Sequence, residues 1–291
     1  MISHIRLNAN AKINLSLDVI EKRDDGYHEV SMIMQEIDLC DIVEIQKIDK
    51  NNTNKVSIEL GIENALNIPC DERNTAYKAA KILIDKFKIN SGIKIKIIKN
   101  IPSEAGLAGG SSDAAAVIKG MNEIFNLNMS IGQMLEVGKL IGADVPFCIL
   151  GKTALAEGIG EKLTKLPLFC DVNLAIVKPD FGVSTPLVYN KYDQQEPIKH
   201  PDNALLINCI NNKDLLTLSR EMYNVLEEVT SKIHPLIKKI EKILVEEGAI
   251  GAMMSGSGPT VFGIFNDEDT ALKCVKNVKK IYKSTYYAKT I

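Results

Sequence analysis

The stretch from Pro102 to Ala116 places a turn rich in glycine and serine directly before an alanine-rich helix, and it constrains the fold more than any other segment. Gly106, Gly109 and Gly110 lack a Cβ atom, so the backbone there can adopt left-handed conformations and approach a bulky group. The first N–H groups of a helix have no partner within the helix and carry the positive end of its dipole, which favours a bound anion. The simpler reading is a glycine turn with a serine cap. Three glycines and two serines within seven residues are more than a cap requires, so the stretch predicts a phosphate-binding loop.

This loop differs from the two commonest phosphate-binding motifs. A P-loop requires a lysine and then serine or threonine after its last glycine, whereas Gly110 is followed by Ser111 and Ser112. A dinucleotide-binding fingerprint places its glycines directly after a strand, with an acidic residue about 20 positions further on. The glycines here do not have that spacing. The sequence therefore indicates a phosphate loop of another class.

Composition narrows the classes of protein to consider. The 291 residues, 45% of them hydrophobic, suit one large domain or two modest ones. A net charge of −2 and the lack of a strongly basic segment disfavour a nucleic-acid partner. No run approaches the ~20 apolar residues of a membrane helix, so we expect no membrane partner. Six scattered cysteines without a Cys-x-x-Cys pair argue against a zinc site or disulfide scaffold and predict a cytoplasmic location.

The first strand has an unusual polar face. Apolar residues alternate with polar ones from Ile5 to Val19, which predicts a half-buried strand. Asparagine is depleted in strands, yet Asn8, Asn10 and Asn14 flank Lys12 on the polar face. We therefore expect this face to contact a ligand.

The remaining pattern mixes helices and strands without strict alternation, which predicts an α+β fold. Ser130 is the predicted N-cap of a helix that reaches Ile141. Glycines and turns cluster near Gly158–Pro167, so we predict a boundary there, with an N-terminal domain over 1–160 and a C-terminal domain over 161–291. Other predicted helices cover 74–87, 110–125, 202–211, 235–247 and 268–281, and predicted strands include 93–98, 260–265 and 285–290.

Two charged residues fit phosphoryl transfer, which requires positive charge near the phosphates and a group that orients or deprotonates the acceptor hydroxyl. Lys12 is a candidate for the first role and Asp144 for the second. Pro146 restricts Val145 toward an extended backbone, so we expect Asp144 just after a helix ends. An unperturbed Asp has a pKa near ~3.9 and is a weak base, so Asp144 would mainly orient the hydroxyl and accept its proton late. A turn-forming aspartate and a solvated strand lysine are the alternatives.

The loop from Pro102 to Ala114 closely resembles the ATP-binding signature of the GHMP kinases, the family of galactokinase, homoserine kinase and mevalonate kinase. Ala108 stands at a position that is sometimes glycine in that signature. More narrowly, the chain resembles the members of this family that act on a cytidine-diphosphate-linked alcohol. That resemblance rests on Ala11–Leu15, Asp25–Glu29, Gly142–Pro146 and Ser255–Pro259.

The resemblance implies transfer of the γ-phosphoryl group of ATP to the 2-hydroxyl of a cytidine-diphosphate-linked methylerythritol, in the non-mevalonate isoprenoid route. It implies the two-domain GHMP kinase architecture: an N-terminal β-α domain with a left-handed crossover and a C-terminal ferredoxin-like domain. Lys12 and Asp144 would be the catalytic pair, and Mg²⁺ is expected from the chemistry, with no ligand identified.

The resemblance also assigns the two binding sites. The ATP-binding residues would be Pro102, Ser103, Glu104, Ala105, Gly106, Leu107, Ala108, Gly109, Gly110, Ser111 and Ser112, together with Asn74 and Lys99. The cytidine substrate would contact Asn14, Tyr27, His28, Thr185 and Tyr189. Two tyrosines flanking the cytosine make physical sense, because stacking of a base on an aromatic ring contributes about 1–3 kcal/mol.

Three alternatives stay open at this stage. The nearest is another small-molecule GHMP kinase, acting for example on homoserine or phosphomevalonate. The second is a catalytically silent nucleotide sensor on the same scaffold. The third, a nucleic-acid-binding module, is disfavoured by the charge balance. We expect a monomer or a weak homodimer.

Overall fold

The computed structural model describes residues 3–48, 56–65, 68–195 and 199–291. The chain forms two compact units. Unit 1 comprises Met1–Ala11, Cys40–Ile101 and Ala108–Leu150, and unit 2 comprises Lys12–Leu39, Pro102–Leu107 and Gly151–Ile291. Because unit 2 takes segments from both sides of residue 160, the division of the sequence into domains 1–160 and 161–291 stays a prediction.

Unit 1 is built on one sheet. Strands β1 (His4–Lys22) and β2 (His28–Ile48) run through both units, and in unit 1 they join β3 (Ile58–Glu63) and β4 (Gly92–Ile98) in the order β3-β4-β2-β1. Strand β4 is antiparallel to β2 and parallel to β3. Helix α1 (Thr75–Phe87) connects the parallel pair β3 and β4, which confirms a β-α crossover, while its left-handed sense stays a prediction.

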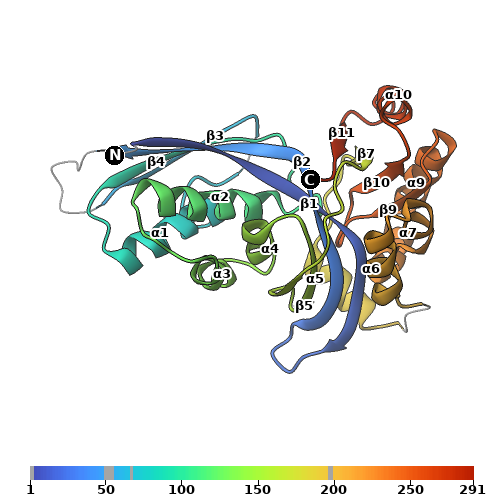
Figure 1. Ribbon diagram of the computed structural model, residues 1–291, viewed down its shortest axis with the longest axis horizontal. Coiled ribbons are helices and arrows are strands. Elements are labelled where there is room, and N and C mark those ends of the chain that lie inside the picture. Colours follow the sequence, from blue (N-terminus) through green and yellow to red (C-terminus); the bar gives the residue numbers. More distant parts are fainter. Residues whose placement is uncertain (1–2, 49–55, 66–67, 196–198) are drawn as a thin grey trace. The chain divides into compact units, whose positions relative to one another are not determined.

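Four helices cover one face of this sheet: α1, α2 (Gly109–Ile124), α3 (Ile131–Lys139) and α4 (Val145–Leu150) (Figure 1). Small residues let α2 pack closely, since Ala114, Ala115 and Ala116 are all buried. At Gly120, a Cβ atom would lie 2.6 Å from Cδ1 of Ile45 on β2, so a larger residue there would require the Ile45 side chain to shift. Short side chains thus hold the helix that begins at the glycine loop against the sheet.

Of two predictions about helix N-termini, one is confirmed and the other is wrong. Ser130 caps α3 as predicted, and its hydroxyl and the Gln133 side chain form a reciprocal capping box. The N-cap of α2 is Ala108, in a left-handed conformation without any side-chain cap. The simpler reading of the glycine loop as a serine-capped turn is therefore wrong.

The prediction of a half-buried first strand is also wrong in its central part. Every residue from Ala11 to Val19 is buried, so the polar side chains are covered as well as the apolar ones. In unit 2, β1 and β2 join β5 (Thr153–Gly158), β6 (Lys162–Lys165) and β8 (Tyr223–Asn224), in the order β6-β5-β2-β1-β8. Lys12, Asn14, Ser16 and Asp18 are thereby placed inside the unit rather than on a surface.

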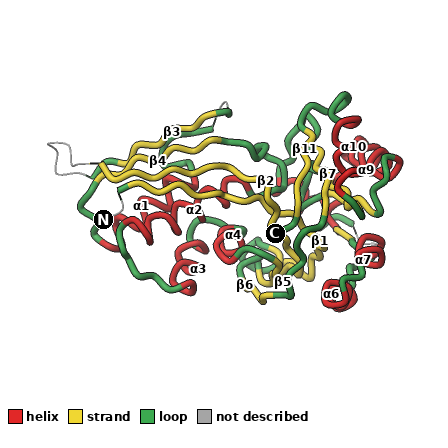
Figure 2. The backbone as a smooth tube through the Cα atoms, turned by 45° about the horizontal axis from the view of Figure 1, so that its top comes forward, coloured by secondary structure: helices red, strands yellow, loops and turns green. Residues whose placement is uncertain are grey.

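A second sheet of unit 2 has the strand order β11-β7-β10-β9, with every neighbouring pair antiparallel. The strands are β7 (Asn173–Val177), β9 (Gly251–Met254), β10 (Val261–Phe265) and β11 (Thr285–Lys289). Helix α9 (Leu236–Glu246) precedes β9, and α10 (Glu268–Val278) lies between β10 and β11. Figure 2 shows both helices on the same side of this sheet. The βαββαβ arrangement confirms the predicted ferredoxin-like unit.

Four more helices complete unit 2: α5 (Thr185–Tyr192), α6 (Asn203–Asn212), α7 (Leu215–Glu221) and α8 (Val225–Ile233). Across the described ranges, no helix combines the length and apolar character needed to cross a bilayer.

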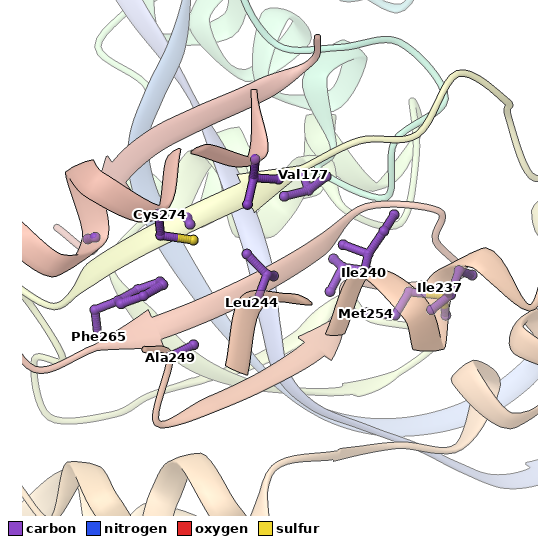
Figure 3. Packing of buried hydrophobic residues seen from close by; sticks show 12 residues of the cluster. Val177, Ile237, Ile240, Leu244, Ala249, Met254, Phe265 and Cys274 are labelled. Atoms are coloured by element: carbon purple, nitrogen blue, oxygen red, sulfur yellow. The ribbon is translucent and has the colours of Figure 1, made fainter. Parts of the chain in front are cut away.

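The core of the second sheet lies between its strands and the two helices (Figure 3). Ile240 and Leu244 project from α9, Cys274 projects from α10, and Phe265 lies on β10, all of them buried. Leu244 is 0% exposed, whereas its neighbour Val245 is 52% exposed. One face of α9 therefore packs in the core, and the opposite face is exposed to solvent.

Replacing Leu244 with Ala should lower the free energy of unfolding by about 2–5 kcal/mol, because it removes buried contacts and leaves a cavity. Urea unfolding followed by circular dichroism measures the change. The matched control is Val245→Ala, for which we expect a change within about 0.5 kcal/mol. Equal effects of the two substitutions would contradict this account of the core.

Candidate active site

The loop before α2 has a left-handed backbone at alternate residues. The φ angles are 50° at Glu104, 74° at Gly106 and 57° at Ala108. At Gly106 a Cβ atom would lie 2.3 Å from the carbonyl oxygen of Ser255, so this close approach also requires glycine. The hydroxyl of Ser255 donates to the carbonyl of Gly106 over 3.1 Å. Within unit 2, the first half of the glycine loop is therefore fastened to a second small-residue loop.

The first turn of α2 offers unpaired N–H groups. The amide of Ser112 donates to the carbonyl of Ala108 over 2.9 Å, and its hydroxyl donates to the carbonyl of Asn10 over 2.5 Å. Among the residues that the structure describes, no acceptor is found for the N–H groups of Gly109, Gly110 and Ser111. These three donors have the geometry that an anion at a helix N-terminus requires.

Lys12 has a buried ammonium group with one polar partner. The side chain is in unit 2 and the residue is 4% exposed; Nζ donates to Oδ1 of Asn14 over 2.6 Å. The described residues contain no carboxylate in ion-pair contact with it. Asn14 is 0% exposed, and its Nδ2 donates to the sulfur of Met32. Burying a charge without a counter-ion is costly, so this arrangement favours an anionic ligand beside Lys12.

Asp144 follows the end of α3, as predicted, and directly precedes a further helix, α4. Its carbonyl accepts the amide of Cys148 over 3.1 Å, and Val145 is the first residue of α4. The prediction that Pro146 keeps Val145 extended is wrong, because proline is tolerated in the first turn of a helix. The residue is half-buried in unit 1, and its carboxylate makes no hydrogen bond or ion pair within the described segments. That carboxylate is available to a ligand.

A buried charge cluster lies next to the start of α2 in unit 1. Nζ of Lys99, at the end of β4, contacts Oδ2 of Asp41 and donates to Oδ2 of Asp113 over 2.7 Å. Asp41 also accepts the amides of Asn100 and Ile101 over 2.6 Å and 2.8 Å. Burial, with the charge of Asp41 added, outweighs Lys99 and raises the pKa of Asp113 to about 7. The cluster ties the residues before the loop to the first turn of α2.

Two predicted ATP residues have partners within the protein. Asn74 caps α1 by accepting the amide of Ala76 over 2.8 Å, and its Nδ2 donates to the carbonyl of Pro69. Next to it, the hydroxyl of Thr75 donates to the carbonyl of Gly110 over 2.6 Å. Asn74 and Lys99 both lie beside the segment that leads into α2, and their roles toward ATP stay predictions.

The predicted cytidine residues gather in unit 2. His28 follows the turn between β1 and β2, and its Nε2 lies 2.7 Å from Oδ1 of Asp193. The ring centroids of His28 and Tyr189 are 4.7 Å apart, and Tyr27 is 59% exposed. Lys22 donates to Oδ2 of Asp193 over 2.6 Å. Burial pushes the pKa of Asp193 upward, but the hydrogen bonds from Lys22 and His28 outweigh it and hold that pKa below its ordinary value.

Thr185 links this region to the second small-residue loop, since its hydroxyl lies 2.8 Å from the hydroxyl of Ser257. In that loop, a Cβ atom at Gly256 would lie 3.4 Å from Nζ of Lys12. Lys12, Asn14, Gly106 and Thr185 are therefore brought together around Ser255–Pro259 within unit 2. Asp144 and the start of α2 belong to unit 1.

Sequence reasoning missed several residues that shape these sites. Lys99 was predicted, but its partner Asp41 was not: Asp41 lies two residues before Val43 and so shares its buried face of β2, and this parity was the available signal. Asp193 had no comparable signal, because its pairing with His28 spans 165 residues. Within the described ranges, no group of three His, Cys, Asp or Glu side chains could hold a metal ion.

Replacing Lys99 with Met should lower the free energy of unfolding at pH 8 by about 3–5 kcal/mol, because two buried carboxylates lose their shared cation. The loss should shrink toward pH 5, where the carboxyl of Asp113, whose pKa is raised, takes up a proton. Urea unfolding at both pH values measures this. Lys96→Met on the same strand breaks only an exposed pair with Glu63 and should cost about 0–1 kcal/mol. A similar loss in both variants would contradict the cluster's role.

Known proteins match the chain over its whole length. The N-terminal domain of GHMP kinases matches residues 74–152, and the GHMP kinase C-terminal domain matches residues 206–284. The chain is 49% identical to a Clostridium tetani protein named 4-diphosphocytidyl-2-C-methyl-D-erythritol kinase, covering 99% of this chain and 100% of that one. An Acetivibrio thermocellus protein of the same name is 51% identical, covering 99% of each chain.

Solved structures of related kinases have the same fold as this chain. A crystal structure of 4-(cytidine 5'-diphospho)-2C-methyl-D-erythritol kinase superposes with a TM-score of 0.82 at 27% identity, covering 98% of this chain and 99% of that one. Homoserine kinase from Cytophaga hutchinsonii, at 20% identity and a TM-score of 0.76, covers 100% of this chain and 95% of that one and shares the fold. The glycine loop that opens α2 and the ferredoxin-like sheet thus occur together in a chain that belongs to the GHMP kinase family.

Proposed function

We propose that this chain transfers the γ-phosphoryl group of ATP to the 2-hydroxyl of 4-diphosphocytidyl-2-C-methyl-D-erythritol, in the non-mevalonate route to isoprenoid precursors. The observation that carries the proposal is the buried Lys12 ammonium, which Asn14 holds and no described carboxylate neutralises. The near-50% identity to kinases of that name over the full chain supports the choice of substrate.

In this proposal the phosphate chain of ATP lies against the N–H groups of Gly109, Gly110 and Ser111. The loop from Pro102 to Ala108 and Ser112 contribute further ATP contacts. Asn74 and Lys99 also belong to the ATP site: Asn74 precedes Thr75, whose hydroxyl donates to the carbonyl of Gly110, and Lys99 is bonded to Asp113 of α2. Mg²⁺ bound to ATP neutralises phosphate charge when present. A dedicated acidic cage is unnecessary, because Mg²⁺ retains waters and takes one or two carboxylates beside the phosphates.

The chemical step uses two side chains. Lys12 stabilises the negative charge that develops during transfer, and Asn14 fixes its ammonium by the 2.6 Å hydrogen bond. Asp144 orients the acceptor hydroxyl and takes its proton as the bond to phosphorus forms. The absence of an internal partner for its carboxylate within the described residues supports this assignment.

The cytosine ring is held by Tyr27, His28 and Tyr189. When His28 is neutral and donates Nε2–H to Asp193, its Nδ1 is an acceptor, which suits the exocyclic amino group of cytosine. The two tyrosines supply stacking surface, and Thr185 adds a polar contact from the start of α5. A small aliphatic alcohol would make no use of these aromatic walls.

We further propose a cytoplasmic protein that acts as a monomer or weak homodimer and binds no nucleic acid. Support comes from the net charge of −2 and from six cysteines between which the structure forms no disulfide.

Replacing Asp144 with Asn should reduce the rate of phosphoryl transfer by about 10²- to 10⁴-fold, because the general base is lost. Asparagine is an equally good residue before a helix, so α4 should be retained. Rapid-quench kinetics measure the transfer rate, and calorimetry should find the binding of ATP and substrate unchanged. Asp85→Asn on α1, a surface change, is the control. Wild-type transfer by the Asp144 variant would reject the catalytic assignment.

Replacing Tyr189 with Ala should weaken binding of the cytidine substrate by about 1–3 kcal/mol, or roughly 5- to 150-fold in KM, with the KM for ATP unchanged. Tyr189→Phe keeps the ring and should bind normally. Leu187→Ala on the same helix is the control, since that side chain is 47% exposed. Steady-state assays measure the KM values for the cytidine substrate and for ATP.

The wild-type protein is also assayed with homoserine and phosphomevalonate. Turnover with one of these alcohols but not with the cytidine substrate would reject the proposed substrate.

A further inference from the structure

The second small-residue loop, Ser255–Pro259, is fully buried and adjoins Lys12. Its Gly256 and Gly258 have φ angles of 60° and 89°, a backbone that glycine adopts without strain. Ser255 is fastened to Gly106, and a Cβ atom at Gly256 would lie 3.4 Å from Nζ of Lys12 and 3.6 Å from Oδ1 of Asn14. A shift of this backbone would therefore move groups that contact the reacting phosphates in the proposed function.

Three side chains of one helix hold this loop. Asn224, the N-cap of α8, donates Nδ2 to the carbonyls of Met254 and Gly256 over 2.9 Å and 2.8 Å. Glu227 accepts the amide of Met254 over 2.7 Å. Thr230 donates its hydroxyl to the carbonyl of Ser257 over 3.2 Å. Spaced three residues apart, they lie on one face of the helix, and we call them the α8 clamp.

The clamp is buried and its charge is balanced locally. Asn224, Glu227 and Thr230 are 2%, 8% and 0% exposed. The other carboxylate oxygen of Glu227, Oε1, contacts Nζ of Lys238 on α9. The same Nζ lies 3.0 Å from Oε2 of Glu241. Asn224 is in addition paired with Leu17 on β1, the strand that carries Lys12. The clamp is thus anchored to α9 and to the strand of the reactive lysine.

The direction of the hydrogen bonds matters for the loop. Within one planar peptide unit the C=O and N–H bonds point in opposite directions. Because Asn224 draws the carbonyl of Gly256 toward α8, the N–H group of Ser257 points away from α8. Within the segments that the structure describes, that N–H group has no acceptor. The clamp therefore fixes both the place of the loop and the side on which it presents this donor.

We propose that Asn224, Glu227 and Thr230 are positioning residues for phosphoryl transfer. They hold Met254 and the second small-residue loop that follows it in a fixed position relative to Lys12 and Gly106. The proposal rests on the proposed kinase function. It requires no contact between the clamp and either substrate.

Asn224→Asp tests the clamp with the helix cap preserved. The carboxylate can still accept the amide of Leu226, as Oδ1 of Asn224 does over 3.1 Å, but it presents oxygen to two carbonyls in place of a donor. We expect kcat to fall at least tenfold, with the KM values for ATP and the cytidine substrate within about threefold of wild type. Asp214→Asn, the reverse exchange at the exposed N-cap of α7, should leave kcat unchanged.

Thr230→Val provides a second test of the clamp, which remains usable if the Asn224→Asp variant does not fold. It removes one hydroxyl at nearly constant shape and should lower kcat about three- to tenfold, whereas Thr230→Ser should restore the wild-type value. Ser231→Ala is the neighbouring control on the same helix. Melting temperatures of all variants are measured alongside.

Wild-type kcat in a folded Asn224→Asp or Thr230→Val variant would overturn the clamp. So would a loss of kcat that Thr230→Ser fails to restore or that Ser231→Ala reproduces, because the effect would then be general destabilisation. The wild-type rate with the cytidine-linked alcohol tests the proposed function itself. Should that rate be nil, the ratio of variant to wild-type kcat is measured with the family alcohol that the wild type does accept, so the two proposals fail separately.

Discussion

A buried ammonium group without an internal counter-charge is the constraint on which the site depends. Lys12 lies in the part of β1 that is covered on both faces, and Asn14 offers it only a neutral oxygen. Among the described residues, Lys99 is the instructive contrast, because its equally buried ammonium is shared between Asp41 and Asp113. A fold can retain an uncompensated cation when a ligand supplies the charge, and a phosphorylated nucleotide supplies several. Lys99 is thus neutralised within the fold, whereas Lys12 is the lysine to which the proposed function assigns the chemistry.

The small residues around Lys12 follow from the same constraint. An anion close to a buried cation requires backbone donors at short range, and side chains would keep the backbone away. Gly106 has no room for a Cβ atom because the carbonyl oxygen of Ser255 occupies that space. At Gly258, a Cβ atom would lie 2.5 Å from the sulfur of Met254. The two loops are therefore interlocked at Gly106, and a larger residue at that position would force them apart.

Much of this arrangement was readable from the sequence. The density of glycine before an alanine-rich segment predicted a loop that opens a helix, and its binding of phosphate stays a prediction. Periodicity placed single helices and strands of the C-terminal half, whereas their ferredoxin-like arrangement was implied by the family resemblance. The polar face of β1 was recognised, although its burial was not, because covering it takes unit 2 segments remote in sequence, such as Asn203 hydrogen-bonded to Ser16. Local rules failed at Pro146, where the preference of the preceding residue for extended backbone gave way to the tolerance of proline in a first helical turn. They failed again at Ala108, where a left-handed residue replaced the serine cap that Ser111 or Ser112 would have supplied.

The substrate side shows why residue types alone do not define a site. Tyr27 and His28 sit at a turn between two long strands, whereas Tyr189 and Asp193 come from α5 and the residue that ends it. The hydrogen bonds of Asp193 with Lys22 and His28 join these elements, and they hold the pKa of Asp193 below its ordinary value. With Asp193 ionised, it is the imidazole that donates, so the orientation of His28 and the acceptor it presents are set by a residue that makes no substrate contact in this scheme. In the proposed function, base recognition therefore depends on a pairing between distant segments, and the acceptor that His28 presents is set by Asp193, which no local sequence motif indicates.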